Sequence, residues 1–136
     1  MPTASVNGIE LHYHRAGHGP PVLFLNGSGS TLADVAPLLD IVAGQLEVVA
    51  HDQRGLGRSA KPPGPYTMAD YASDALALLD LVAWPTCRVV GVSFGGMVAQ
   101  ELAVTAPRRV ERLALLCTCA AGGKQSNEAD RNQNSK

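Results

Sequence analysis

The sequence predicts an α/β fold in which helices cover both faces of a mostly parallel sheet of about six strands. Short apolar runs alternate along the chain with longer segments whose apolar residues recur at helical spacing. The runs at residues 22–25 and 87–92 are apolar almost throughout, as strands buried on both faces are. Strands that alternate with helices in this way join into a parallel sheet through right-handed crossovers.

The N-terminal residues predict an antiparallel hairpin. Asn7-Gly8 between two apolar residues signals a tight turn, and residues 9–15 form the returning strand. A loop rich in glycine and proline follows at residues 17–21, before the first buried parallel strand. The chain starts without a signal segment and has no apolar run of about 18 residues, so we expect a soluble, cytoplasmic protein.

Two helices are predicted from apolar residues that share one face. The first spans residues 31–45, and its inward face is formed by Leu32, Val35, Leu38, Leu39 and Val42. A strand at residues 46–50 follows it. The second helix spans residues 67–82 with Thr67 as N-cap, and its inward residues are Leu76, Leu79 and Val82.

A third strand–helix unit and a last strand complete the predicted domain, which spans residues 1–123. The unit consists of a strand at 87–92 and a helix at 94–105, and the last strand lies within residues 110–118. Residues 124–136 are almost entirely polar or charged, which predicts a disordered tail. The last strand is apolar but would lie at the sheet edge, so we expect self-association through it.

The motif with the clearest chemistry is Gly91-Val92-Ser93-Phe94-Gly95, which reads G-x-S-x-G. It lies between a predicted strand and a predicted helix, and this context is that of a nucleophile elbow. Such a strained turn lifts the serine hydroxyl clear of the backbone and needs small residues beside it. The alternative is a buried glycine-rich turn that contains an incidental serine.

A second loop follows a strand at the same predicted sheet edge. Residues 26–30 read Asn-Gly-Ser-Gly-Ser, and a glycine-rich loop there can supply one N–H of an oxyanion hole. The backbone N–H groups of Ser28 and Phe94 are the predicted donors. The alternative, a turn that leads into a helix N-cap at Ser30 or Thr31, is compatible with that role.

A third motif, residues 52–59, reads Asp-Gln-Arg-Gly-Leu-Gly-Arg-Ser. Its glycines imitate a dinucleotide fingerprint, but a fingerprint must open a helix, and the prolines at 62, 63 and 65 prevent one here. We therefore expect no nucleotide cofactor and interpret the segment as an ordered loop. In that loop Asp52 and Arg54 have structural roles.

These three motifs, in this order, resemble those of the α/β-hydrolase superfamily. The resemblance covers residues 5–123 of this chain, which correspond to only the N-terminal half of a typical member. The elbow stretch looks most like small-molecule esterases, enol-lactonases and cofactor-free perhydrolases. The resemblance implies the strand order 1-2-4-3-5-6, with the sheet truncated after about six strands. It also implies Ser93 as nucleophile and the N–H groups of Ser28 and Phe94 as oxyanion donors.

The family's catalytic acid and histidine have no counterpart here, because no histidine follows Ser93 in the sequence. His51 is the one surrogate base to consider, since it ends a strand at the same edge. Two inter-strand steps of about 4.8 Å separate it from the elbow strand, which is too far for a direct hydrogen bond. We expect His12 and His14 to lie on a solvated strand face rather than to bind a metal.

The remaining composition excludes other classes of function. The formal net charge of −1 gives no basic surface for nucleic acid. The cysteines at 87, 117 and 119 fall in predicted strands without metal-ligand spacing, so we expect reduced, mostly packed thiols and no metal. Two hypotheses remain: a serine hydrolase of a small ester or lactone, or a catalytically incomplete fragment that binds ligands or self-associates without turnover.

Overall fold

The computed structural model describes residues 2–120, so the predicted tail at 124–136 lies outside the described residues. Along the chain the strands are β1 (Thr3–Val6), β2 (Ile9–Ala16), β3 (Pro21–Leu25), β4 (Glu47–His51), β5 (Cys87–Val92) and β6 (Val110–Leu116). The helices are α1 (Leu32–Val42), α2 (Met68–Leu81), α3 (Phe94–Thr105) and a 3-10 turn at Pro107–Arg109. Each predicted strand and helix is present, with its ends shifted by a few residues.

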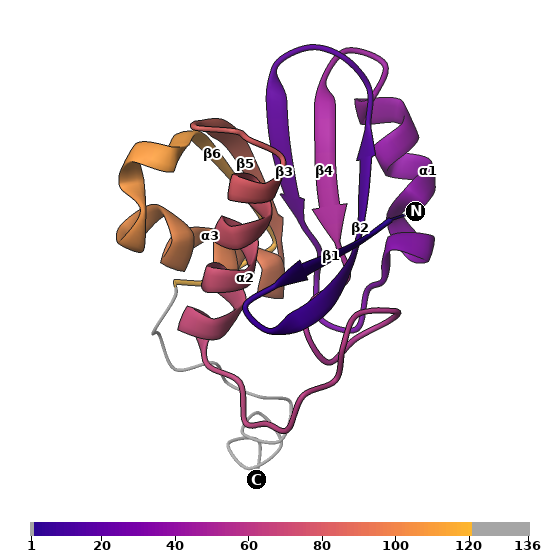
Figure 1. The fold of residues 1–136 in the computed structure, drawn as a ribbon. Coiled ribbons are helices and arrows are strands. Elements are labelled where there is room, and N and C mark those ends of the chain that lie inside the picture. The colour runs from indigo at the N-terminus through magenta and orange to yellow at the C-terminus, as the bar shows by residue number, and fades with distance from the viewer. Residues whose placement is uncertain (1, 121–136) are drawn as a thin grey trace, which may run out of the picture.

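The strands form one six-stranded sheet in the order β1-β2-β4-β3-β5-β6, which confirms the predicted order. The hairpin of β1 and β2 is antiparallel, and β2 pairs antiparallel with β4. The remaining neighbours in the sheet, β4 with β3, β3 with β5 and β5 with β6, are parallel. The hairpin turn has positive φ at Asn7 and Gly8, as a two-residue turn requires. The parallel strands β3 and β4 run side by side down the middle of Figure 1.

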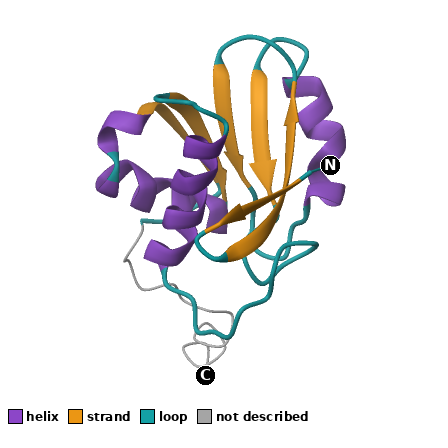
Figure 2. Cartoon of the chain, in the orientation of Figure 1, coloured by secondary structure: helices purple, strands orange, loops and turns teal. Residues whose placement is uncertain are grey.

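Helices lie on both faces of the sheet, as Figures 1 and 2 show. On one face α2 and α3 pack over a large apolar core that includes Leu23, Val49 and Val89. On the other face α1 covers a smaller core around Phe24 and Val48. Alternate residues of the parallel strands thus contribute to different cores, which is the arrangement expected of a sheet buried on both sides.

The β6 strand is the edge of the sheet among the described residues. Only Val110 is partly buried, and the rest of the strand is exposed. Leu113, Leu115 and Leu116 are 40%, 39% and 52% exposed, although they are large apolar side chains. Unpaired backbone groups and exposed leucines in one strand are the features that favour association with another chain.

Three expectations about individual side chains are wrong. His12 is buried, because the loop at residues 52–60 covers it, and its backbone N–H donates to the Ser59 hydroxyl at 2.9 Å. Leu38 is 46% exposed, because it borders a groove over β3, β5 and β6 that no helix within residues 2–120 covers. Cys117 and Cys119 follow β6 and are exposed, whereas Cys87 is buried as expected.

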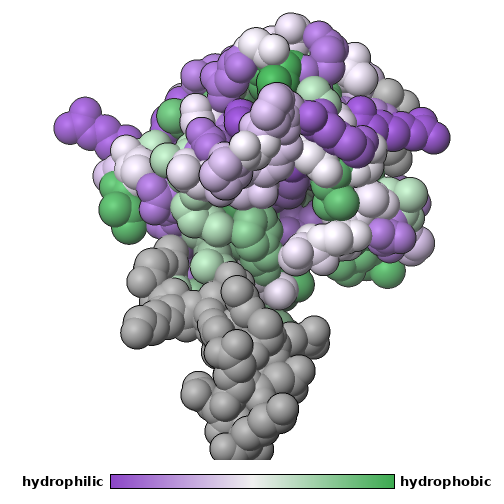
Figure 3. Space-filling view, turned by 90° about the horizontal axis from the view of Figure 1, so that it is seen from below, coloured by the Kyte–Doolittle hydropathy of each residue, from purple (hydrophilic) through white to green (hydrophobic). Residues whose placement is uncertain are grey.

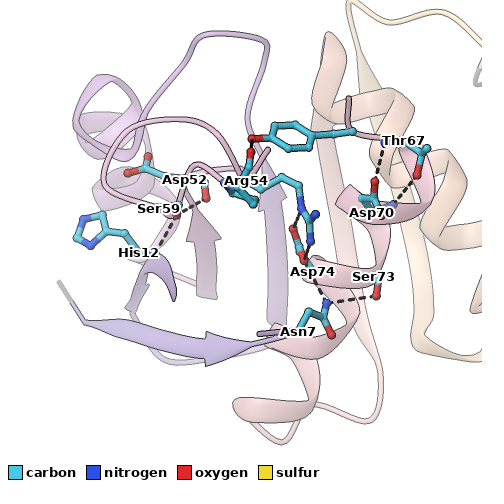
Figure 4. Close-up of polar contacts among 11 residues, drawn as sticks. Asn7, His12, Asp52, Arg54, Ser59, Thr67, Asp70, Ser73 and Asp74 are labelled. Atoms are coloured by element: carbon cyan, nitrogen blue, oxygen red, sulfur yellow. Dashed lines mark hydrogen bonds and ion pairs between the residues drawn. The ribbon is translucent and has the colours of Figure 1, made fainter. Parts of the chain in front are cut away.

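A buried ion pair ties the N-terminal hairpin, the loop after β4 and α2 together (Figure 4). The Arg54 guanidinium donates to both carboxylate oxygens of Asp74 at 2.6 and 2.7 Å. The Asn7 amide donates to the same carboxylate at 3.1 Å. Asp74 is fully buried, so these donors compensate for the loss of water around its charge. This confirms a structural role for Arg54.

No helix within residues 2–120 has the length and apolar character needed to cross a membrane.

Replacement of Asp74 by alanine is expected to lower the free energy of unfolding by about 3–5 kcal/mol, because it leaves the Arg54 charge without its partner. The matched control is Asp80→Ala on the same helix. Asp80 pairs with Arg109 but its side chain is 64% exposed, so its loss should cost at most about 1 kcal/mol. Urea denaturation of both variants measures the difference, and equal losses would contradict this role for the buried pair.

Candidate active site at the carboxyl ends of the strands

Ser93 stands at the sharp turn between β5 and α3, where the sequence predicts an elbow. Its φ of 54° and ψ of −118° lie outside the regions that a non-glycine residue prefers, and its side chain is exposed. Two contacts hold the turn, since the Ser93 N–H donates to the Leu116 carbonyl at 2.8 Å and the Thr118 hydroxyl donates to the Ser93 carbonyl at 2.7 Å. Sequence reasoning missed Thr118 as a support of the turn.

The three glycines of the elbow are required by close packing. A Cβ on Gly95 would lie 2.1 Å from the Leu25 carbonyl oxygen, and one on Gly91 would lie 2.6 Å from the Gly95 carbonyl. A Cβ on Gly96 would lie 2.6 Å from the Thr118 side chain. Only glycine fits these positions, so the G-x-S-x-G-G pattern is what lets α3 start directly against the ends of β3 and β5.

A cavity of about 210 Å³ lies between the loop after β3, the loop after β4 and the start of α3. Ser28 and Phe94, the predicted oxyanion donors, both line it. Phe94 is the first residue of α3, so its N–H has no acceptor within the helix. Gly27 brings the cavity next to the elbow, because a Cβ on Gly27 would lie 3.5 Å from the Ser93 Cβ.

Aromatic rings form one wall of this cavity, and sequence reasoning did not anticipate them. Tyr71 packs edge-on against Phe94 and against Tyr66, with ring centroids 5.0 and 5.9 Å apart. The Arg54 guanidinium lies 5.6 Å from the Tyr66 ring centroid and is neutralised by Asp74. The aromatic wall therefore carries no unpaired charge, and the polar residues Ser28, Gln53 and Arg54 complete the lining of the cavity. The aromatic residues come from the loop before α2 and from α2 itself, so no local motif could have indicated them.

Figure 3 views the molecule from the edge at which these loops meet. Hydrophobic surface lies in the middle of this face, with polar surface above it in the picture. A pocket that combines apolar walls with a few polar groups is typical of a site for a small organic ligand.

Asp52 holds the neighbouring loops in place rather than facing the elbow. One carboxylate oxygen accepts from the Leu32 N–H at the start of α1 at 2.7 Å, and the other accepts from the Arg58 N–H at 3.0 Å. The Ser59 hydroxyl donates to the Asp52 carbonyl at 2.6 Å. These bonds fix the loop at residues 52–60 and confirm the structural role expected of Asp52.

The comparison with known proteins agrees with this geometry. The α/β hydrolase fold family matches the chain over residues 20–134. This chain belongs to that family. It is 30% identical to 3-oxoadipate enol-lactonase 2 of Acinetobacter baylyi and 37% identical to the poly(3-hydroxyalkanoate) depolymerase of Ectopseudomonas oleovorans, over 90% and 76% of its own length. The crystal structure of an enol-lactonase from Burkholderia xenovorans superposes with a TM-score of 0.81 at 36% identity, over 86% of this chain.

The chain spans less than half the length of these three relatives, with 46%, 36% and 46% of each covered. The match therefore establishes the α/β-hydrolase fold over the elbow and the preceding motifs. Among the described residues, no group of three or more histidine, cysteine, aspartate or glutamate side chains could hold a metal ion.

His51 ends β4, and β3 lies between it and the elbow strand of this α/β-hydrolase. The ring is buried, and neither of its nitrogens has a hydrogen-bond partner within residues 2–120. Burial lowers the His51 pKa, against the opposing effects of Asp74, Asp52 and the nearby Gln53 side chain. The structure thus does not bring His51 next to Ser93, and its imidazole is held in the neutral form.

Gln53 is a further buried polar residue that sequence reasoning missed. It is 3% exposed and lines the cavity, and its amide atoms lack hydrogen-bond partners within the described residues. Its side chain lies near His51 without reaching hydrogen-bonding geometry. Buried polar groups without partners cost stability, so a polar group that enters the cavity and bonds to Gln53 would be stabilising.

The lowered His51 pKa predicts that the folded chain becomes less stable as the pH is lowered. The ordinary imidazole pKa is 6.5, so below that pH the unfolded chain binds a proton that the folded chain excludes. The free energy of unfolding is therefore expected to decrease as pH falls from 7.5 to 5.5, and His51→Gln should remove part of this decrease. Urea denaturation across this range measures it.

The control for this prediction is His18→Gln, since His18 is exposed in a loop. That variant should keep the pH dependence of the original chain. If the two variants showed the same pH dependence, buried His51 would not be the group responsible.

Proposed function

We propose that this chain carries the nucleophile and the oxyanion hole of a serine hydrolase. The observation that carries the proposal is the exposed Ser93 on a strained turn beside a cavity lined by two predicted backbone donors. In the reaction the Ser93 Oγ would attack an acyl carbonyl and lose its proton to a base. The N–H groups of Ser28 and Phe94 would bind the oxyanion of the tetrahedral intermediate, and water would later release the acid.

The start of α3 supports this assignment electrostatically. Phe94 is the first residue of α3 and lines the same cavity as Ser28, so its N–H has no acceptor within the helix and the helix dipole places partial positive charge there. An anion that develops on the substrate oxygen is thereby stabilised without any rearrangement of the site.

The general base must come from elsewhere, because no histidine follows Ser93 in the sequence. His51 is separated from the elbow by one strand and stays neutral in the core, so it fits the role of surrogate base poorly. We propose that the base is supplied by polypeptide outside this sequence. The relatives are more than twice as long as the segment they share with this chain, which leaves room for such a part.

The substrate class proposed is a small, uncharged ester or lactone. The aromatic wall and the neutralised Arg54 favour an apolar acyl group over an anion. Two of the relatives are named as an enol-lactonase and a polyester depolymerase, and both names describe attack on an ester bond. A serine nucleophile suits such acyl transfer. The predicted cytoplasmic location fits these substrates but stays a prediction.

Labelling with a fluorophosphonate tests whether Ser93 is activated. Because the proposed base is not part of this sequence, intact mass spectrometry of the purified chain is expected to show only slow formation of one adduct, which Ser93→Ala should abolish. Ser28→Ala is the matched control, because it removes a neighbouring hydroxyl while it keeps the backbone N–H proposed for the oxyanion hole. Absence of any labelling in a chain that circular dichroism shows to be folded would contradict Ser93 as the nucleophile, and fast labelling of the chain alone would contradict a base outside this sequence.

The second hypothesis is that the chain acts as a catalytically incomplete fragment that binds a ligand or associates with itself. The exposed edge strand β6 is the specific observation in its favour, because three of its leucines are about 40–50% exposed. This hypothesis requires no base. Failure of the labelling experiment, together with retained binding of a small ester by the folded chain, would favour it.

A further inference from the structure

One buried side chain at the cavity beside the elbow has polar atoms that the fold does not use. Gln53 lies in the loop shortly after the end of β4 and is 3% exposed. Its amide oxygen and its amide nitrogen are both buried without a hydrogen-bond partner within residues 2–120. The same side chain lines the cavity of about 210 Å³. Because a buried amide without partners costs stability, its position at a cavity points to a ligand that pairs it.

The other polar side chains of this cavity leave the Gln53 amide without a partner. The Arg54 guanidinium donates to both carboxylate oxygens of Asp74, at 2.6 and 2.7 Å. The Tyr66 hydroxyl donates to the Pro62 carbonyl. Both groups are fixed by bonds of their own, so neither is directed to the glutamine.

His51 is close to Gln53 but can satisfy only one end of its amide. The two side chains lie near each other without hydrogen-bonding geometry. A small rotation of the amide about its last side-chain bond would pair one of its two atoms with an imidazole nitrogen. The other amide atom would then still have no partner. A contact with His51 therefore does not account for a glutamine at this position.

We propose that Gln53 is a specificity-determining residue, which binds a carboxamide on the acyl group of the substrate. This inference rests on the proposed function, because it places that acyl group in the cavity lined by Ser28 and Phe94. A carboxamide presents its N–H and its C=O side by side, so it can bond both amide atoms of Gln53 at once. These bonds can be nearly linear, which a single hydroxyl oxygen does not allow.

Charge favours a neutral group over a carboxylate at this position. Arg54 is the cation that lines the cavity, and it is already paired with Asp74. A carboxylate has no donor, so it would leave the Gln53 amide oxygen unpaired. A carboxamide carries no charge and supplies both a donor and an acceptor. The methylene groups between it and the reacting carbonyl would pack on the aromatic wall of the cavity.

The spacing of the strands suits a short acyl group. Gln53 follows β4, whereas Phe94 begins α3 after β5, and β3 lies between these two strands. Two inter-strand steps amount to about 9–10 Å, of which the glutamine side chain itself spans a part. A short acyl chain such as that of a succinamate ester covers the remainder, and the volume of the cavity suits a molecule of this size.

NMR titration of the isotope-labelled full chain with two matched esters tests the proposal. Methyl succinamate carries the carboxamide, and methyl isocaproate has an isopropyl group of the same shape in its place. A Ser93→Ala background keeps both esters intact. We expect the carboxamide ester to bind about tenfold more tightly, because it alone pairs the buried amide. Gln53→Met keeps the length of the side chain without its amide and should abolish this preference.

The stability of Gln53→Met separates a ligand-binding role from a structural one. If the amide serves a ligand, an apolar replacement removes two buried, unpartnered atoms from the free chain. The variant is therefore expected to unfold at the same or a higher urea concentration than the unaltered chain. Gln45→Met is the matched control, because Gln45 is exposed and does not line the cavity. It should change neither the preference between the esters nor the urea midpoint.

Three outcomes would overturn the proposal. The first is that the chain binds neither ester, or binds methyl isocaproate at least as tightly as methyl succinamate. The second is a preference for methyl succinamate that persists in Gln53→Met. The third is a Gln53→Met chain that unfolds at a lower urea concentration, as a structural glutamine would.

These measurements do not require an activated Ser93, because they record binding and unfolding rather than turnover. The fluorophosphonate experiment can therefore fail while the preference for the carboxamide is found. If labelling succeeds and the preference is absent, the assignment of Ser93 stands and the role of Gln53 does not.

Discussion

The close contact between the start of α3 and the ends of β3 and β5 is the constraint on which the candidate site depends. Gly95 lies so near the Leu25 carbonyl that no side chain fits between them, and a side chain on Gly91 would collide with the Gly95 carbonyl. Ser93 stands at this turn in a strained conformation, and Phe94 begins α3 beside the loop after β3. The positions of Ser93 and of the cavity beside it follow from this close packing.

A second layer of polar contacts fixes the loops around this turn. Asp52 bonds to the start of α1 and to its own loop, while Arg54 reaches across to Asp74 on α2. Charged side chains at the edge of a sheet are ordinarily exposed to solvent. Here they are buried and paired, and they connect segments that are distant in sequence. Buried His51 and Gln53 are exceptions, since their side-chain polar atoms have no partners within the described residues, and Gln53 lines the cavity.

The two faces of the sheet differ in how completely they are covered. One face has α2 and α3 over a large core, whereas α1 covers only part of the other. Leu116 and Arg88 both line the open part of this second face, where Leu116 is 52% exposed and the Arg88 Nε atom has no partner within the described residues. Ser93 follows β5, whereas Arg88 lies near the start of the same strand.

The sequence by itself determined the elements, the strand order and the position of the elbow, because periodicity, turn residues and the glycines of G-x-S-x-G act over short distances. Only the tertiary structure decided which side chains are buried. The loop at 52–60 covers His12, Leu38 borders a groove that no helix within residues 2–120 covers, and the cavity wall combines Tyr66 and Tyr71 with Phe94. Those outcomes depend on segments that are remote in sequence and meet only after folding, so no local pattern encodes them.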